Sequence, residues 1–532
     1  MMYDTMTDIQ KQALNTSMFK AYDIRTKSAA LTKDLAVRLI HAVGWYLSEV
    51  LKVDEVVLGR DARLGAPALM ETALDLFTQA GLQVIVNPLQ ISTCQFYFSC
   101  MQHPKAAGIM FTASHNPGMY IGMKLMAPGL QTLAMGSGPD GGIACIREAY
   151  CEGKSCNLHT RERNKVLVRR YLDQYIDYSI QLANVEPNTL DGVSLLTDFL
   201  CGAAGTEVVE ALQSLGAKVR VRNLVPDGKF PAGDPNPIID ESIRPTWDIM
   251  RSESFDFGFC YDGDGDRMDV MDSHGSQLTP SFNLSLLIPE IKRFFKEVHA
   301  AGFFGNAPWE PHMYYDVKAN PLSVVQQASR GIGVHIIRNG HSFIKEALRQ
   351  NLGNQYLVAS EESAHYYMNF PLDLKDYSKG FAATENTLYF TILTAKMWSQ
   401  NPHLYEAAMQ KQQSIYRQRE WPCHFFNDEH LQPVVDRVEE LFKAQGLKVF
   451  KTMEDGNDLD AVLMRSGLPE RIDANTNLSG DWLQVAERIS RSEEGMARWE
   501  VASSSSERLA QAVKDIHSVT DGYVEAKLAE YE

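Results

Sequence analysis

Three aspartates at alternate positions form the strongest chemical signal in the sequence. Residues 261–267 read Tyr-Asp-Gly-Asp-Gly-Asp-Arg and follow an apolar run over 255–260. Carboxylates at this spacing, separated by glycines that let the backbone curl, can converge on one hard cation such as Mg²⁺. Asp262, Asp264 and Asp266 would supply only three oxygens, so the ion would keep open positions for water and a phosphoryl oxygen. The segment therefore predicts a magnesium site that serves phosphate chemistry.

Two alternatives compete with this interpretation. An EF-hand calcium loop needs glycine at its sixth position and glutamate at its twelfth, but this segment has Arg267 and Ser273 there. A solvated acidic turn is what Asp-Gly repeats usually form. Aligned aspartates followed by an arginine, directly after a predicted buried strand, are less typical of such a turn. We therefore favour the magnesium site.

The second signal is a serine that follows another predicted strand. The apolar strand 107–111 leads into 112–117, which reads Thr-Ala-Ser-His-Asn-Pro, and Lys124 comes ten residues after Ser114. A serine at a strand end can act as a nucleophile or carry a phosphate, while His115 and Lys124 could stabilise the added charge or move protons. Taken alone, the segment is more typical of an ordinary turn. It is not a G-x-S-x-G elbow, so a hydrolase triad has little support.

Repeated strand–helix–strand units are predicted to position these residues. The units, each given as strand, helix and strand, cover 54–59, 66–79 and 82–86; 193–198, 202–215 and 217–221; and 314–317, 322–328 and 334–337. This rhythm implies mostly parallel sheets, and its recurrence suggests an internally repeated architecture. From about residue 406 a charged helical stretch (431–445) and several turns predict a differently built domain.

The chain length also predicts several domains, because a domain typically takes ~150 residues and the chain has 532. We expect an α/β protein in which three similar mixed α/β domains and a carboxy-terminal α+β domain are arranged around a central cleft. The expected domains cover 1–165, 166–278, 279–405 and 406–532.

Charge and composition narrow the classes of function. The chain has 51 Lys and Arg against 67 Asp and Glu, a net charge of −16, which would repel nucleic acids and anionic membranes. Neither a long apolar run nor a signal-peptide pattern occurs, which predicts a soluble, cytoplasmic protein. The eight cysteines include no C-x-x-C pair, and we expect them to be reduced and mostly buried.

Together, these two signals and two further segments resemble the α-D-phosphohexomutase family, and especially its phosphomannomutase/phosphoglucomutase branch. The four segments occur in the family's order: 19–25 (Phe-Lys-Ala-Tyr-Asp-Ile-Arg), 112–117, 262–267 and 361–365 (Glu-Glu-Ser-Ala-His). Shorter matches lie at 59–63, 226–231, 316–318 and 340–345. Because the matches cover nearly the whole chain in order, the resemblance is far more specific than any one motif.

The resemblance implies chemical roles for residues near the first three motifs. Ser114 would carry the transferable phosphate and would contact a Mg²⁺ ion held by Asp262, Asp264 and Asp266. The groups expected to act beside it are Arg25, His115, Lys124, Arg267 and His341. Of these, Lys124, His115 and His341 are, in that order, the candidates for a general base.

The resemblance also implies which residues hold the sugar phosphate. Glu361 and Ser363 would hydrogen-bond ring hydroxyls, and His365, like His341, could bind phosphate or brace a loop. Tyr22 and Lys318 lie in matching segments and are further candidates for substrate binding. Because the 3- and 4-hydroxyls are common to mannose and glucose, this loop would not distinguish the two sugars.

Two departures from the family pattern affect the substrate loops. Ser360 and Ala364 stand where the family usually has glycine, which would restrict the backbone wherever a positive φ is needed. The family's carboxy-terminal phosphate loop reads approximately Arg-x-Ser-x-Thr-Glu-Pro, and 488–494 is its best counterpart here. The residues there that suit a phosphate are Arg488, Ser490, Arg491 and Ser492. A cluster of Arg and Ser at a solvated helix end is the alternative interpretation of this segment.

The function that the resemblance implies is reversible transfer of a phosphoryl group between O1 and O6 of a hexose phosphate, through a hexose 1,6-bisphosphate. Expected cofactors are Mg²⁺ and an activating glucose or mannose 1,6-bisphosphate. The expected partner is a small phosphosugar, with no nucleic acid or membrane, and the protein would be a monomer or homodimer. Alternatives are a phosphoglucosamine mutase, a sugar-phosphate-binding protein with little turnover, and a phosphatase.

Overall fold

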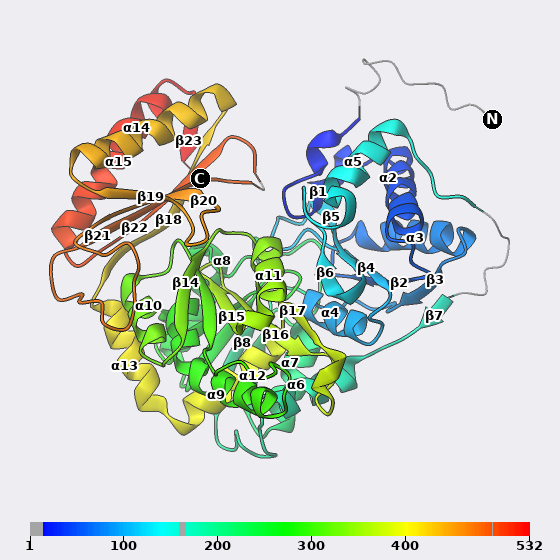
Figure 1. Ribbon diagram of the computed structural model, residues 1–532, viewed down its shortest axis with the longest axis horizontal. Coiled ribbons are helices and arrows are strands. Elements are labelled where there is room, and N and C mark those ends of the chain that lie inside the picture. The colour runs from blue at the N-terminus through cyan, green and yellow to red at the C-terminus, as the bar shows by residue number, and fades with distance from the viewer. Residues whose placement is uncertain (1–13, 159–165, 492, 532) are drawn as a thin grey trace. The chain divides into compact units, whose positions relative to one another are not determined.

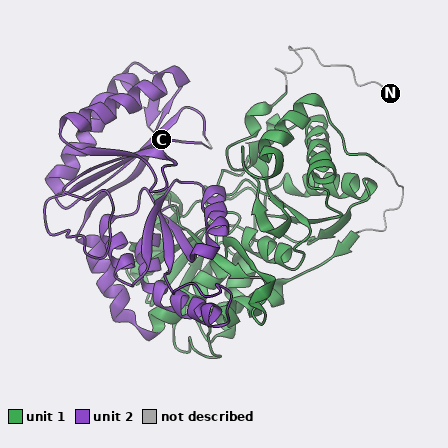
Figure 2. Ribbon diagram, in the orientation of Figure 1, with its two compact units in different colours: residues 1–277, 363–399 green, residues 278–362, 400–532 purple. Residues whose placement is uncertain are grey.

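The computed structural model describes residues 14–158, 166–491 and 493–531 (Figure 1). The chain divides into two compact units (Figure 2). Unit 1 comprises residues 1–277 and 363–399, and unit 2 comprises 278–362 and 400–532. None of the described helices combines the length and apolar character needed to cross a membrane.

Unit 1 begins with a mixed sheet in the order β1-β5-β4-β2-β3-β7, with β6 paired to β5. Its strands are β1 (Ile24–Lys27), β2 (Glu55–Arg60), β3 (Gln83–Val86), β4 (Ala107–Phe111), β5 (Tyr120–Ala127), β6 (Gln131–Thr132) and β7 (Val166–Val168). Its helices are α2 (Lys33–Trp45), α3 (Ala66–Gln79), α4 (Thr93–Met101) and α5 (Ile143–Glu152). β2 is parallel to β3 and β4, whereas β5 runs antiparallel to β4.

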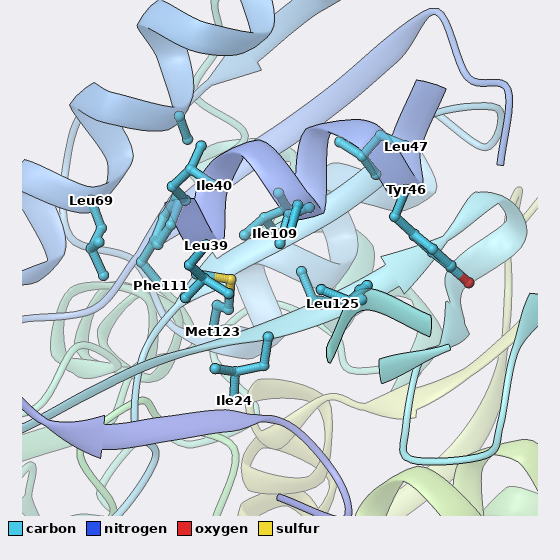
Figure 3. Close-up of a cluster of buried hydrophobic side chains, with 14 of the residues drawn as sticks. Ile24, Leu39, Ile40, Tyr46, Leu47, Leu69, Ile109, Phe111, Met123 and Leu125 are labelled. Atoms are coloured by element: carbon cyan, nitrogen blue, oxygen red, sulfur yellow. The ribbon is translucent and has the colours of Figure 1, made fainter. Parts of the chain in front are cut away.

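The core of this sheet follows from its side-chain alternation (Figure 3). Ile109 and Phe111 alternate along β4, and Met123 and Leu125 alternate along β5, so all four reach one face of the sheet. Helix α2 adds Leu39 and other apolar residues at helical spacing to the same buried cluster. This packing fixes β4 and β5, and therefore the turn between them.

A second sheet in unit 1 has the order β11-β10-β8-β9. Its strands are β8 (Ser194–Asp198), β9 (Lys218–Arg222), β10 (Phe257–Tyr261) and β11 (Met268–Asp272), followed by β12 (Gln277–Leu278). Its helices are α6 (Leu172–Leu182), α7 (Gly205–Ser214) and α8 (Asp240–Ser252). The antiparallel hairpin of β16 (His365–Pro371) and β17 (Phe381–Glu385) also belongs to unit 1 and leads into α12 (Thr387–Gln400).

Unit 2 contains a parallel set of strands and an antiparallel sheet. In the parallel set, β13 (His312–Asp316) lies between β14 (Gly333–Ile337) and β15 (Tyr356–Glu361). The helices are α9 (Pro280–Ala300), α10 (Pro321–Ala328), α11 (His341–Gln350) and α13 (Pro402–Gln413). The antiparallel sheet has the order β19-β20-β21-β22-β18-β23, with α14 (Leu431–Ala444) and α15 (Ser506–Glu525) over one face (Figure 1).

The antiparallel sheet consists of β18 (Tyr416–Phe425), β19 (Lys448–Thr452), β20 (Asp458–Ser466), β21 (Leu483–Ile489), β22 (Met496–Ser503) and β23 (Ala529–Tyr531). Trp499 and Val485 of the sheet share a buried cluster with Val438 and Phe442 of α14 and Ile516 of α15. The predicted strand–helix–strand units and the different carboxy-terminal architecture are confirmed. All eight cysteines are free thiols, and six are buried, as expected.

Candidate active site

Ser114 lies in the turn between β4 and β5 and is buried, with 3% of its surface exposed. Its φ is +52°, in the left-handed region that residues other than glycine rarely adopt. The Ser114 amide donates to Thr112 Oγ1 at 2.8 Å, and that hydroxyl donates to Asp61 Oδ2 at 2.7 Å. The turn is therefore held in a strained conformation by buried hydrogen bonds, as is common at functional sites.

Arg63 stabilises the same turn through hydrogen bonds to its carbonyl groups. Its guanidinium donates to the carbonyl oxygens of Ser114 and Asn116, both at 2.6 Å, and of Pro117 at 2.9 Å. Its Nε lies 3.1 Å from Asp61 Oδ2, and both side chains of this ion pair are fully buried. One planar group with several fixed donors thus satisfies the carbonyls of the turn, which no shorter or more flexible cation could do.

The three predicted aspartates converge after β10. Asp262, Asp264 and Asp266 are fully buried, and each offers a carboxylate oxygen within 4.8 Å of the others. Within the described part of the chain, Asp262 Oδ2 and Asp264 Oδ1 have no hydrogen-bond partner. Burial and the two neighbouring carboxylates raise the pKa of Asp262 well above its usual value. Orphaned, mutually repelling oxygens fit a hard divalent cation as their common ligand.

Lys124 and Thr93 hold these carboxylates in place. Lys124 Nζ lies 2.8 Å from Asp264 Oδ2 and also pairs with Asp266. Burial disfavours its charge, but Asp264, Asp266 and Glu385 together raise the pKa of Lys124 above its usual value. Thr93, at the start of α4, donates from Oγ1 to Asp264 Oδ2 at 2.6 Å and from its amide to the Asp264 carbonyl at 2.7 Å.

The serine turn lies against the aspartate loop. A Cβ atom at Gly263 would come within 2.9 Å of the Ser114 carbonyl oxygen, so only glycine allows this approach. His115 joins the two loops, with Nδ1 3.1 Å from Ser114 Oγ and Nε2 3.5 Å from an Arg267 nitrogen. Because arginine can only donate, Nε2 is the acceptor and Nδ1 carries the proton toward Ser114. Burial, together with Arg267 and Arg25, lowers the pKa of His115 well below its usual value and keeps the ring neutral.

Arg25 reaches the same turn from β1. Its Nε donates to Asp23 Oδ2 at 2.7 Å, and its NH1 donates to the Asn116 side-chain oxygen at 2.7 Å. Tyr22 is half-buried and precedes the strand. The sequence-predicted residues Arg25, Ser114 and His115 are thus brought together, with Asn116 as the link.

His365 approaches the aspartates from the predicted sugar loop. Its Nε2 lies 3.4 Å from Asp266 Oδ1, and Ser363 Oγ lies 3.0 Å from its Nδ1. Ala364 has φ of +70°, and its carbonyl accepts from the Met268 amide at 2.9 Å. Of the two positions where the family usually has glycine, Ala364 therefore adopts the left-handed conformation, while Ser360 lies within β15.

The other half of the predicted sugar loop belongs to unit 2. Glu361 ends β15, and its Oε1 accepts from Asn339 Nδ2 at 2.9 Å. The same amide donates to Asp316 Oδ2 at 3.0 Å, which lies 3.8 Å from Lys318 Nζ. Burial raises the pKa of Asp316 to about 7, although Lys318 opposes the shift. His341 is buried at the first turn of α11.

The predicted phosphate-binding residues of unit 2 that the structure describes each contact a carboxylate. Arg488, at the end of β21, binds both carboxylate oxygens of Glu420 at 2.9 and 2.8 Å. Ser490 Oγ lies 3.3 Å from Glu493 Oε2. Arg491 is exposed and pairs with Asp460. Ser492 lies outside the described residues.

Family descriptions match two segments in the amino-terminal part of the chain, and known proteins are similar to it over most of its length. The family description "Phosphoglucomutase/phosphomannomutase, alpha/beta/alpha domain I" matches residues 16–134, and that of domain II matches 173–275. A relative described as "Phosphohexose mutases", from Xanthomonas campestris pv. campestris, is 31% identical over 401 residues, covering 74% of this chain and 80% of the relative. The chain belongs to the phosphoglucomutase/phosphomannomutase family. The resemblance carried by the four motifs is confirmed.

Further members of the phosphoglucomutase/phosphomannomutase family are also similar to this chain. A phosphomannomutase of Salmonella montevideo is 32% identical over 360 residues, covering 66% of this chain and 73% of that protein. The crystal structure of a phosphoglucomutase/phosphomannomutase family protein from Burkholderia thailandensis is 20% identical, and it matches with a TM-score of 0.70 over 96% of this chain and 98% of that one. This likeness confirms the multidomain α/β fold.

Sequence reasoning misses several residues that organise this family member's site. Asp61 and Arg63 stand in a segment that matches the family but shows no role by itself, although a buried Asp-x-Arg before a helix can brace a turn. Thr93 carries no motif, because its partner Asp264 is 171 residues away in the sequence. Glu420 also lacks a local signal, since only the pairing of three strands brings it to Arg488.

Proposed function

We propose that the protein is a phosphohexomutase that interconverts the 1-phosphate and 6-phosphate of mannose, glucose or both. The observation that carries this proposal is the seating of Ser114, strained and buried, directly against the loop of Asp262, Asp264 and Asp266. A buried serine whose turn packs against a carboxylate cluster able to hold a divalent cation is suited to carrying and releasing a phosphoryl group.

In the proposed reaction, phosphorylated Ser114 donates to the free hydroxyl of a bound hexose monophosphate. The hydroxyl oxygen forms a new bond to phosphorus, the bond from phosphorus to Ser114 Oγ breaks, and the hydroxyl proton passes through a base to the released Ser114 Oγ. The resulting hexose 1,6-bisphosphate turns over and returns its other phosphoryl group to Ser114 by the reverse step. The second monophosphate is then released, so that no phosphate is gained or lost over the cycle.

The side chains around Ser114 supply orientation and positive charge. Asp262, Asp264 and Asp266 would hold a cation such as Mg²⁺, with an oxygen at Ser114 as a further ligand; when bound, that ion neutralises charge on the transferring group. His115 presents its Nδ1 proton to the oxygen that leaves phosphorus. Arg25 and Arg267 place guanidinium charge beside the same turn, where preorganised cations favour a phosphoryl transition state.

Residues of unit 2 and the sugar loop are proposed to bind the rest of the substrate. Glu361 and Ser363 would accept and donate hydrogen bonds at ring hydroxyls, while Lys318 and Arg488 would bind the phosphate that is not being transferred. Because the 3- and 4-hydroxyls are shared by mannose and glucose, these contacts support use of both sugars.

A coupled assay tests the proposal. Mannose 1-phosphate, glucose 1-phosphate and glucosamine 6-phosphate are compared with Mg²⁺ and a trace of glucose 1,6-bisphosphate. Turnover of the first two substrates is expected, and Ser114→Ala and Asp264→Asn should abolish it. Ser518→Ala, which changes an exposed serine of α15, should leave it unchanged. Release of inorganic phosphate in step with substrate loss would show a phosphatase instead, and binding without turnover of any sugar would overturn the enzyme assignment.

A further inference from the structure

A bulge in β18 turns one carboxylate toward the arginines of unit 2. The pairing of β18 with β22 steps from Gln418 opposite Val501 to Trp421 opposite Trp499, so β18 carries one extra residue at this point. Arg419 and Glu420 lie in this bulge. Bulges commonly re-aim a side chain next to a functional site, and here the re-aimed side chain is that of Glu420.

Glu420 meets two arginines that face each other across neighbouring strands. Arg488 of β21 is directly opposite Arg498 of β22, and two like charges in such positions repel. Glu420 accepts from Arg488 through both oxygens, and its Oε1 lies 3.3 Å from Arg498 NH1. Lys318 Nζ lies 3.6 Å from Glu420 Oε2. One carboxylate therefore pairs with three converging cations.

The environment of Glu420 shows how strongly this anion is held. Its side chain is 14% exposed, and those of Lys318, Arg488 and Arg498 are 20% exposed or less. Burial disfavours the charge, yet Arg488, Lys318 and Arg498 hold the pKa of Glu420 well below its usual value. A fork of guanidinium donors presents the same geometry to a carboxylate as to a phosphate, so the group that fits this place is an anion with two or more oxygens.

We propose that Glu420 is a built-in competitor of the substrate phosphate: its carboxylate occupies the place between Arg488, Arg498 and Lys318 and must leave when a phosphate enters. This inference rests on the proposed function, which assigns Arg488 to the substrate. Glu493 already pairs with Arg498, so a phosphate dianion added beside Glu420 would face two carboxylates at the same cations. Displacement of Glu420 lowers this repulsion, and the protein binds sugar phosphate more weakly than its cations alone would.

Glu420→Gln tests the inference, because it keeps the shape of the side chain and removes the charge. Binding of inorganic phosphate and of glucose 1-phosphate is measured by calorimetry at low ionic strength. If Glu420 fills the place about nine-tenths of the time, the variant should bind each ligand about tenfold more tightly than the wild type. Glu440→Gln removes an equal charge from the exposed face of α14 and should bind as the wild type does. Equal or weaker binding by folded Glu420→Gln would overturn the inference.

Two further measurements decide whether the phosphate binds at the place that Glu420 fills. Arg498→Ala in the Glu420→Gln background should reverse the gain, whereas a gain that persists would place the bound phosphate elsewhere and overturn the inference. If Glu420→Gln does not fold, a structure of the wild type with glucose 1-phosphate decides the question: Glu420 withdrawn from Arg488 supports the inference, and Glu420 unmoved beside a phosphate there refutes it. Because phosphate binding is read without turnover, failure of the mutase assay leaves these outcomes distinct.

Discussion

Lys124 Nζ lies 2.8 Å from Asp264 Oδ2, and both side chains are almost completely buried. β5 carries the lysine and the loop after β10 carries the aspartate, so this contact joins the two sheets of unit 1 at the proposed metal site. Lys124 places a positive charge beside the carboxylates of Asp264, Asp266 and Glu385. Because these side chains are buried, water does little to stabilise their negative charges.

Replacing Lys124 should therefore destabilise the metal-free protein. We expect Lys124→Gln to lower the free energy of unfolding by about 3 kcal/mol in the presence of a chelator, because buried carboxylates lose their partner. Urea denaturation measures the change. Lys379→Gln, which breaks the exposed pair of Lys379 with Asp373, is the matched control and should have little effect. Equal stability of Lys124→Gln and the wild type would contradict this electrostatic role.

A divalent cation should stabilise the protein through the aspartates. Mg²⁺ at about a hundred times its dissociation constant should raise the free energy of unfolding by about 2.7 kcal/mol, since the folded state alone forms the site. Thermal denaturation with Mg²⁺ and with chelator measures this gain. Asp266→Asn should lose most of it, whereas Asp272→Asn, at the end of β11, should retain it. A gain that survives in Asp266→Asn would place the cation elsewhere.

Arg63→Lys should damage both stability and turnover. Lysine cannot reach the carbonyls of Ser114, Asn116 and Pro117 together, so buried acceptors lose their donors. We expect a loss of about 3 kcal/mol of unfolding free energy and a fall in kcat with a smaller change in KM, because the Ser114 turn loses its conformation. Arg147→Lys, on the exposed face of α5, should change neither. Normal kcat in Arg63→Lys would show that the Ser114 turn keeps its conformation without the hydrogen bonds from Arg63.

Much of this arrangement can be read from the sequence, and the reasons are local. Asp262, Asp264 and Asp266 are spaced within one loop, so their convergence needs only the turn that Gly265 allows at φ of +72°. The strand before Ser114 is equally predictable, because it is an apolar run. The hydrogen bonds from Arg63 to the Ser114 turn are harder to predict, because the carbonyl acceptors lie about fifty residues away in the sequence and their position depends on how β2, β4 and β5 pair.

Glu420 illustrates what sequence reasoning cannot reach. The resemblance to the family makes 488–494 the counterpart of a phosphate loop, and no pattern near these residues shows that a carboxylate on another strand already binds Arg488. That contact depends on a one-residue bulge, which leaves no clear signature in an ordinary strand sequence. The sequence likewise names Ser360 and Ala364 as the two positions where a positive φ would matter, and only the structure shows that Ala364 adopts it.

Ala364→Gly should be tolerated or slightly stabilising. Alanine in the left-handed region costs roughly 1–2 kcal/mol, whereas burial of its methyl group contributes about 0.8 kcal/mol. We therefore expect a gain of about 0.5 kcal/mol in unfolding free energy, measured by urea denaturation. Ala211→Gly, on the buried face of α7, should instead lose about 2 kcal/mol, because it loses helix propensity as well as a buried methyl group. Comparable losses at both positions would mean that Ala364 carries no strain.

Stability should also depend on pH through Glu207. Burial raises the pKa of Glu207 to about 8, and Ser92 Oγ and Gln95 Nε2 hydrogen-bond to its carboxyl group. The folded state then keeps a proton that the unfolded chain has already lost, so this stabilisation is complete below about pH 4.5 and disappears as the pH rises through 8. We expect Glu207→Gln to reduce the fall in unfolding free energy between about pH 5 and 9 by about 4 kcal/mol, while Glu186→Gln, an exposed change, should not. An unchanged pH profile of the unfolding free energy in Glu207→Gln would show that Glu207 is not a source of the pH dependence.

The most direct test of the central claim follows one phosphoryl group. The protein is incubated with glucose 1,6-bisphosphate labelled in both phosphates, separated from it, and digested for mass spectrometry before and after addition of unlabelled mannose 1-phosphate. The account predicts label on Ser114 that passes to the sugar and appears as labelled bisphosphate or mannose 6-phosphate. Label on another residue, or label that leaves Ser114 only as inorganic phosphate, would contradict it.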